Sequence, residues 1–177
     1  MRKVLVVVDM QNDFIDGSLG TAQAQRIVEN VVKKIQAYQG ELVIATRDTH
    51  GENYLETSEG KHLPVPHCIR GTKGWEIRDE VAKALVQVKG EIIDKPTFGS
   101  ELLAEKLAQT AEEEELEIEL VGLCTDICVV SNGLLLKAKL PEAVIKVDAS
   151  CCAGVTPESH KAALLTMKMC QVEIQGD

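Results

Sequence analysis

The stretch that decides the fold of this 177-residue chain runs from Leu116 to Val130 and reads LEIELVGLCTDICVV. Residues 116–121 are apolar enough for a buried strand, and residues 125–139 have the pattern of a helix. Cys128 therefore lies where a strand is followed by a helix N-terminus, whose partial positive charge is expected to lower the pKa of the thiol. The alternative is a small buried side chain without chemistry, which is the commonest fate of a free cysteine.

Two further apolar stretches end in side chains that would complement this thiol. Residues 4–8 form a β-branched run followed by Asp9, and residues 91–93 lead to Lys95. Active sites of open α/β sheets form beyond the carboxyl ends of the strands, so Asp9, Lys95 and Cys128 are expected to converge. A carboxylate, an ammonium and a thiol make an activated nucleophile, although a loop-capping Asp9 and a surface Lys95 are the plainer alternatives.

Strand-like and helix-like segments alternate along the chain. This alternation predicts one domain, residues 1–177, folded as a three-layer α/β/α sandwich around a six-stranded, mostly parallel sheet. The expected strands are residues 4–8, 42–46, 91–93, 117–121, 143–147 and 172–174. The expected helices are one around residues 27–35 and others at 75–86, 100–109, 125–139 and 157–169, with Ser100 and Thr156 as N-caps.

Residues 50–74 do not follow this alternation, because they contain glycines, prolines and polar groups with little apolar periodicity. A structureless segment of this length within a compact domain usually serves a function. The segment begins at the motif Asp48-Thr-His50, and His67 lies within it. Two imidazoles and a carboxylate can bind a divalent transition metal with positions left open for water or substrate. The alternative is a surface loop whose histidines only form hydrogen bonds.

The composition excludes several classes of partner. A net charge of −9 provides no basic surface for nucleic acid or an anionic membrane. No segment reaches the roughly 18 apolar residues of a membrane span, and the chain begins with a strand rather than a secretory signal, so we expect a cytoplasmic protein. In that compartment the six cysteines are expected to be reduced thiols. The acidic run at residues 112–115 is interpreted as solvated, without a function.

Five segments in this order resemble the isochorismatase-like cysteine hydrolases and, among these, the nicotinamidases. The resemblance covers nearly the whole chain and implies the Rossmann-like sandwich of that superfamily. The segments are VVDMQNDF ending at Phe14, TRDTH ending at His50, PHC ending at Cys68, the strand end at Lys95, and GLCTDIC ending at Cys128.

The resemblance implies that Asp9, Lys95 and Cys128 are catalytic. The activity it implies is a metal-assisted conversion of nicotinamide to nicotinate and ammonia. The thiolate would attack the carboxamide carbon, and water would then cleave the resulting thioester. The resemblance also implies that the protein forms a homo-oligomer. The expected binding partner is a small-molecule carboxamide substrate.

The same resemblance implies an oxyanion site at the start of the helix. There the peptide bond between Leu123 and Cys124 would be cis, and the backbone N–H groups of Cys124 and Cys128 would bind the oxyanion. Phe14 would line the pocket and pack on the substrate ring.

By the resemblance, Asp48, His50 and His67 bind a metal that holds the ring nitrogen of nicotinamide. Glu59 is the candidate for a fourth ligand, and His62 competes with it. Zinc is the first expectation for this nitrogen and oxygen ligand set, and iron and manganese also suit it.

Two other interpretations stay open. Nicotinamidases commonly carry an aromatic residue shortly before the last metal histidine, where this chain has Leu63, Pro64 and Val65. This departure leaves room for pyrazinamide-like or other small carboxamides, whereas true isochorismatases lack the nucleophilic thiol. The second interpretation is a non-enzymatic metal or redox-sensing protein that uses the six thiols.

Overall fold

The computed structural model describes residues 1–176. Its centre is a six-stranded sheet with strand order β3-β2-β1-β4-β5-β6, in which every neighbouring pair is parallel. The strands are β1 (Arg2–Val8), β2 (Leu42–Asp48), β3 (Glu91–Lys95), β4 (Leu116–Leu123), β5 (Val144–Ala153) and β6 (Glu173–Gln175).

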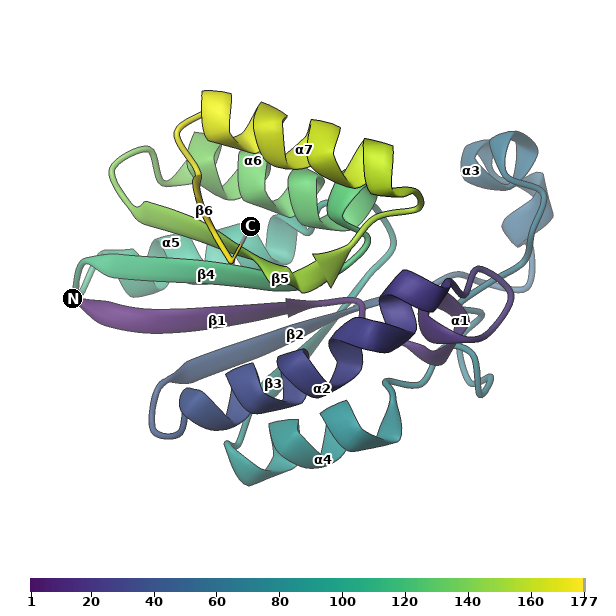
Figure 1. Cartoon of the computed structure of the whole chain (residues 1–177), viewed down its shortest axis with the longest axis horizontal. Coiled ribbons are helices and arrows are strands. Elements are labelled where there is room, and N and C mark those ends of the chain that lie inside the picture. The colour runs from purple at the N-terminus through teal and green to yellow at the C-terminus, as the bar shows by residue number, and fades with distance from the viewer. Residues whose placement is uncertain (177) are drawn as a thin grey trace.

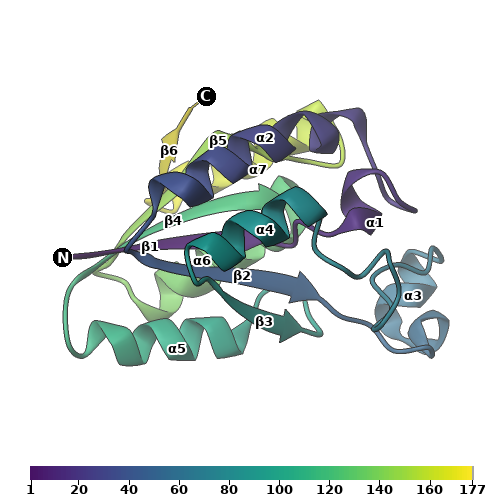
Figure 2. The same cartoon turned by 90° about the horizontal axis from the view of Figure 1, so that it is seen from below.

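Helices cover both faces of this sheet, which confirms the predicted three-layer sandwich (Figures 1 and 2). The α-helices are α1 (Asn12–Ile15), α2 (Ala22–Ala37), α3 (Ser58–His62), α4 (Asp79–Gln87), α5 (Glu101–Ala111), α6 (Val130–Lys139) and α7 (Pro157–Met169). Two short turns complete the set, the 3₁₀ turn η1 (Tyr54–Glu56) and the π-helical turn η2 (Thr125–Val129). None of the helices in residues 1–176 is long and apolar enough to cross a membrane.

Strand β1 shows why the sheet needs two apolar faces. Val4, Val6 and Val8 pack into one core with α5, α6 and α7, whereas Leu5 and Val7 pack into a second core with α2 and α4. Successive side chains of a strand point to opposite faces, so a strand buried on both sides must be apolar at every position. The unbroken β-branched run in the sequence has this origin.

The expected helix at residues 75–86 begins later than predicted, at Asp79. Trp75 precedes the helix and packs against a cation, because the guanidinium of Arg47 lies 3.6 Å from its ring centroid. The indole N–H of Trp75 donates a hydrogen bond to Thr49 Oγ1 at 2.8 Å. These contacts with Arg47 and Thr49 hold Trp75 outside the helix, although the sequence had predicted that the helix begins at this residue.

The sequence had indicated a structureless segment at residues 50–74. The structure differs, because this segment contains η1 and α3. Thr57 caps α3 by accepting a hydrogen bond from the N–H of Gly60 at 3.0 Å. A Cβ at position 60 would overlap the carbonyl oxygen of Tyr54, so glycine is required where the two turns pack together. Helices this short contain too few residues to show an apolar period.

The carboxyl ends of β1, β2, β3 and β4 lie at one edge of the sheet, and α3 projects beyond that edge (Figure 1). Gly122 in β4 has a φ of 116°, and a Cβ there would overlap the backbone of Val8 in β1. Glycine therefore allows the close approach of these two strands immediately before the chain turns toward Cys128.

Candidate active site

The structure brings Asp9, Lys95 and Cys128 into contact at this edge. Lys95 Nζ lies 2.8 Å from Asp9 Oδ2 and 3.4 Å from Cys128 Sγ. Asp9 directly follows β1, Lys95 ends β3, and Cys128 lies in η2 between β4 and α6. At most 4% of each residue's surface is exposed. A thiol, an ammonium and a carboxylate thus share one buried site.

Asp9 is held in a backbone conformation that few non-glycine residues adopt, with φ at 47°. The hydroxyl of Thr46 donates a hydrogen bond to Asp9 Oδ1 at 2.8 Å, and the N–H of Asp9 donates to the carbonyl of Thr46 at 3.2 Å. Backbone strain of this kind is concentrated at functional sites, where the surrounding structure imposes it. The carboxylate of Asp9 is therefore fixed relative to its neighbours.

The electrostatics of Cys128 differ from the expectation drawn from its position near a helix N-terminus. Burial and then Asp9 raise the pKa of the Cys128 thiol well above its usual value, and Lys95 opposes them only in part. The prediction of a lowered pKa was wrong, because enclosure and a neighbouring carboxylate outweigh the partial charge of the helix. The resting cysteine is therefore a thiol that needs a base.

Asp9 and Lys95 have the properties that such a site requires. Burial raises the pKa of Asp9, against the opposing effect of Lys95, which makes its carboxylate a better proton acceptor. Burial alone would lower the pKa of Lys95, but Asp9, Cys128 and Asp48 together raise it, so the ammonium stays charged. Lys95 Nζ also donates a hydrogen bond to the carbonyl of Thr97 at 3.0 Å.

The turn before Cys128 has the expected backbone. The peptide bond between Leu123 and Cys124 is cis, as the resemblance implied. The carbonyl of Cys124 accepts hydrogen bonds from the N–H groups of Ile127 at 3.1 Å and Val129 at 3.0 Å. These bonds form the start of η2, and single π-helical turns are frequent at functional sites.

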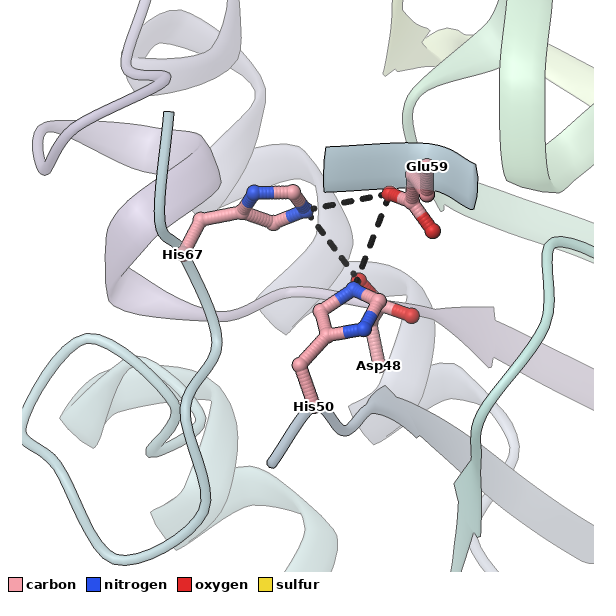
Figure 3. Close-up of side chains that lie close together, drawn as sticks. All are labelled: Asp48, His50, Glu59 and His67. Carbon is pink, nitrogen blue, oxygen red and sulfur yellow. Dashed lines mark hydrogen bonds and ion pairs between the residues drawn. The ribbon is translucent and has the colours of Figure 1, made fainter. Parts of the chain in front are cut away.

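A second polar cluster lies beside the thiol and consists of Asp48, His50, Glu59 and His67 (Figure 3). One ligand atom from each of these residues lies within 4.8 Å of the others. His67 Nε2 is 3.5 Å from both Asp48 Oδ2 and Glu59 Oε1. His50 Nε2 is 3.0 Å from Asp48 Oδ2 and 3.6 Å from Glu59 Oε1. The four side chains converge from the end of β2, the loop after it, α3 and the loop that follows α3.

The chemistry of this cluster fits a divalent metal ion. The Nδ1 atom of His67 lies 2.9 Å from the carbonyl of Val65, an arrangement that orients Nε2 toward the two carboxylates. Two imidazole nitrogens and two carboxylate oxygens form a ligand set that zinc, iron and manganese accept. Of the two candidates for the fourth ligand, Glu59 lies within the cluster. His62 instead places its Nδ1 2.8 Å from the carbonyl of Ser58.

Sequence reasoning missed two residues that hold this cluster in position. The side chain of Gln11 forms two hydrogen bonds with the backbone of Asp48. Its Nε2 donates to the Asp48 carbonyl at 2.8 Å, and its Oε1 accepts from the Asp48 N–H at 2.7 Å. Asp13 Oδ2 accepts a hydrogen bond at 2.8 Å from the N–H of Cys68, next to His67. Polar residues directly after a buried strand are the signal that would have found both.

A cavity of about 830 Å³ opens onto both clusters. His50, Glu59, His67 and Cys128 line it, and its apolar walls are formed by Phe14, Leu19, Leu63, Pro96, Phe98 and Ile127. The Phe14 ring centroid is 5.5 Å from that of His67. The cavity thus offers a flat ring an apolar wall, with a thiol and a set of candidate metal ligands beside it.

The model of the Isochorismatase domain matches residues 3–176 of this chain. The chain belongs to the isochorismatase family. This isochorismatase-family protein is 28% identical over 198 residues to a nicotinamidase/pyrazinamidase of Mycobacterium tuberculosis, with 97% of each chain covered. It is 27% identical over 173 residues to an uncharacterized isochorismatase family protein of Bacillus subtilis, with 93% of each covered.

Solved structures of the family agree with this assignment. A nicotinamidase/pyrazinamidase of Bacillus subtilis superposes with a TM-score of 0.85 at 26% identity, covering 99% of this chain and 100% of that one. A pyrazinamidase of Pyrococcus horikoshii in complex with zinc superposes with a TM-score of 0.79 at 26% identity, covering 98% of both. With such relatives along its whole length, this isochorismatase-family protein is a hydrolase that acts on amide bonds.

Proposed function

We propose that this hydrolase converts nicotinamide to nicotinate and ammonia through a thioester on Cys128. The observation that carries the proposal is the contact of Lys95 Nζ with Cys128 Sγ and Asp9 Oδ2, on a cavity that a cluster of candidate metal ligands also lines. Relatives named as nicotinamidases and pyrazinamidases support the choice of an aromatic carboxamide.

Substrate binding would use the polar cluster that lines the cavity beside the thiol. Asp48, His50, Glu59 and His67 would hold the metal, and when bound it would supply a Lewis-acidic partner for the ring nitrogen of the substrate. Zinc is our first choice, because a pyrazinamidase relative is described in complex with zinc. Phe14 would pack on the substrate ring and keep the carboxamide group directed at Cys128.

The first half of the reaction begins with proton transfer. Asp9 accepts the proton of the Cys128 thiol, and the sulfur forms a bond to the carboxamide carbon. The carbonyl oxygen then carries the negative charge, which the N–H groups of Cys124 and Cys128 stabilise. The Lys95 ammonium stabilises the thiolate while it forms.

The second half releases both products. Protonated Asp9 donates its proton to the amide nitrogen as the carbon–nitrogen bond breaks, and ammonia leaves a thioester on Cys128. A water molecule then attacks the thioester carbon while Asp9 accepts one of its protons. The carbon–sulfur bond breaks, Asp9 returns the proton to the sulfur, and the product acid loses its remaining proton to solvent and leaves as nicotinate.

Ammonia release from nicotinamide tests the proposal. Wild type should release ammonia, whereas Cys128→Ala and Asp9→Asn should each lose roughly 10³-fold or more in kcat, because members of a catalytic unit act together. Cys170→Ala is the matched control, since Cys170 is an exposed free cysteine outside the cavity lining, and it should retain wild-type activity.

Hydrolysis at the wild-type rate in both active-site variants would eliminate the cysteine mechanism. Hydrolysis of other amides, with none of nicotinamide, would leave the mechanism and change the substrate. That second candidate has support of its own. Where relatives carry an aromatic residue shortly before the last metal histidine, this chain has the segment Leu63-Pro64-Val65. Leu63 lines the cavity and is 37% exposed. Pyrazinamide and substituted pyridine carboxamides should therefore be assayed in parallel.

A role as a redox sensor has less support. Burial raises the pKa of five of the six thiols, which lowers the fraction of reactive thiolate at neutral pH. The five are Cys68, Cys124, Cys128, Cys151 and Cys152. The cytoplasmic location and the homo-oligomeric state stay predictions.

A further inference from the structure

Asn132 is a polar side chain placed where the helix α6 is otherwise packed into the apolar core. It lies four residues after Cys128 and its surface is fully buried. A buried amide is costly unless its donors and acceptor are hydrogen-bonded. Asn132 satisfies this condition completely, because both of its N–H donors and its carbonyl oxygen have partners.

These three bonds join two different parts of the chain. Asn132 Nδ2 donates to the carbonyl of Cys128 at 2.8 Å and to the carbonyl of Phe98 at 3.2 Å. Its Oδ1 accepts from the N–H of Ser100 at 2.9 Å. The first bond lies within the turn of the nucleophile, and the other two reach the connection between β3 and α5.

That connection is the one that follows Lys95. Lys95 Nζ donates to the carbonyl of Thr97 at 3.0 Å, so the ammonium is tied to the same loop that Asn132 holds at Phe98 and Ser100. The sheet alone does not fix the distance from Lys95 to Cys128, because β3 and β4 are separated by β2 and β1. Asn132 supplies a direct link between the loop of one and the turn of the other.

We propose that Asn132 is a positioning residue, which holds the Lys95 ammonium 3.4 Å from the Cys128 sulfur. The assignment rests on the proposed function, since it takes Cys128 as the nucleophile and Lys95 as its partner. Asn132 does not line the cavity, whereas its neighbour Ser131 does. It therefore acts through Cys128 and Lys95, and its loss should change the rate of the chemical step rather than substrate binding.

An amide is the side chain that this link requires. It offers two donors and an acceptor in one plane, whereas a hydroxyl has a single donor and an aliphatic side chain has none. Serine at position 132 could still donate to the Cys128 carbonyl, four residues earlier in the helix, but it is too short to keep both bonds to the loop. Serine at this position therefore distinguishes the two hydrogen bonds to the β3–α5 connection from the hydrogen bond to the Cys128 carbonyl.

The test compares Asn132→Ala and Asn132→Ser with Leu136→Ala. Leu136 lies one turn further along α6 and is equally buried, but it does not line the cavity, and its aliphatic side chain has no group that could hydrogen-bond to the β3–α5 connection. Three quantities are measured for each protein: kcat and KM for nicotinamide, the rate at which iodoacetamide alkylates Cys128, followed by mass spectrometry of its peptide, and Tm. All rates are taken at a temperature at which every variant is folded.

Both Asn132 variants should lose roughly 10- to 100-fold in kcat, with KM within about twofold of wild type, because displacement of a reacting group by about 1 Å has effects of this size. Alkylation of Cys128 should slow as well, since Lys95 stabilises the thiolate. Leu136→Ala should lower Tm and leave kcat and the alkylation rate near the wild-type values.

Three results would overturn the assignment. A lower Tm in Asn132→Ala, as in Leu136→Ala, with kcat and the alkylation rate unchanged would reduce Asn132 to a core residue. Wild-type rates in Asn132→Ser would show that the bond within the helix suffices, and this variant also serves if Asn132→Ala does not fold. If wild type does not hydrolyse nicotinamide, the proposed function fails, and an unchanged alkylation rate in both variants would still refute the positioning role separately.

Discussion

Asp48 and Lys95 connect the two clusters of the site. Asp48 Oδ1 lies 3.5 Å from Lys95 Nζ, while Oδ2 faces the imidazoles of His50 at 3.0 Å and His67 at 3.5 Å. One carboxylate thus contacts both the ammonium beside the nucleophile and the candidate metal ligands. A substitution in the cluster of candidate metal ligands should therefore alter the surroundings of Lys95, and a substitution of Lys95 should alter those of the candidate ligands.

Replacement of Lys95 should destabilise the fold as well as stop catalysis. Lys95→Met leaves the buried carboxylate of Asp9 without its cation and removes the contact of Lys95 with Asp48, and removal of one partner of a buried ion pair costs about 3–5 kcal/mol. Urea denaturation measures this loss. Lys33→Met is the control, because the pair of Lys33 with Glu29 is exposed and should contribute at most about 1 kcal/mol. Equal effects of the two substitutions would contradict the buried pair.

Metal content should depend on four residues and not on a fifth. His67→Ala and Glu59→Gln should lower the metal bound per chain, as measured by elemental analysis after dialysis, and chelation of wild type should lower Tm because a ligand of the native state stabilises it. His62→Ala should retain the metal, since the imidazole of His62 faces the carbonyl of Ser58. Loss of metal in His62→Ala, with retention in Glu59→Gln, would reverse the choice of the fourth ligand.

Phe14 should govern substrate binding more than the chemical step. Phe14→Leu removes the aromatic wall beside His67, so KM for nicotinamide should rise roughly tenfold, in line with the worth of one aromatic contact, and kcat should change little. Phe98→Leu is the comparison, because Phe98 also lines the cavity but is 46% exposed. If steady-state kinetics show the larger KM change in Phe98→Leu, then Phe98 rather than Phe14 packs on the substrate ring.

Acid should destabilise the protein partly through a site remote from the cavity. Burial would raise the pKa of Asp148, but its pair with Lys34 at 2.7 Å and its hydrogen bonds from Ser150 lower it below the ordinary value of 3.8. A group with a lowered folded-state pKa contributes stability above its unfolded-state pKa and loses it as the pH falls through the folded-state value. Asp148→Asn should therefore have a lower free energy of unfolding than wild type near neutral pH. Urea titrations should show this difference shrinking below about pH 4. A difference that does not depend on pH would contradict the role of the ion pair.

The sequence predicted the sheet well because its signals are local. Every residue of β1 from Val4 to Val8 is apolar, and the N-caps at Ser100 and Thr156 each accept a backbone hydrogen bond three residues on, as predicted. The short helix α3 was missed because its stability depends on a glycine contact with Tyr54 and on a single cap at Thr57. Interactions of that kind leave no periodic pattern.

The sequence by itself determined which residues stand at the strand ends, because apolar runs, caps and the residues that follow them are properties of neighbouring positions. It thereby named Asp9, Lys95 and Cys128 and the candidate metal ligands Asp48, His50 and His67. Only the tertiary structure decided that Glu59 rather than His62 lies in the cluster of those three residues, and that the pKa of Cys128 is raised rather than lowered. Both outcomes depend on distances and burial set by segments remote in the chain, and the energy of a charged group depends on what surrounds it in space.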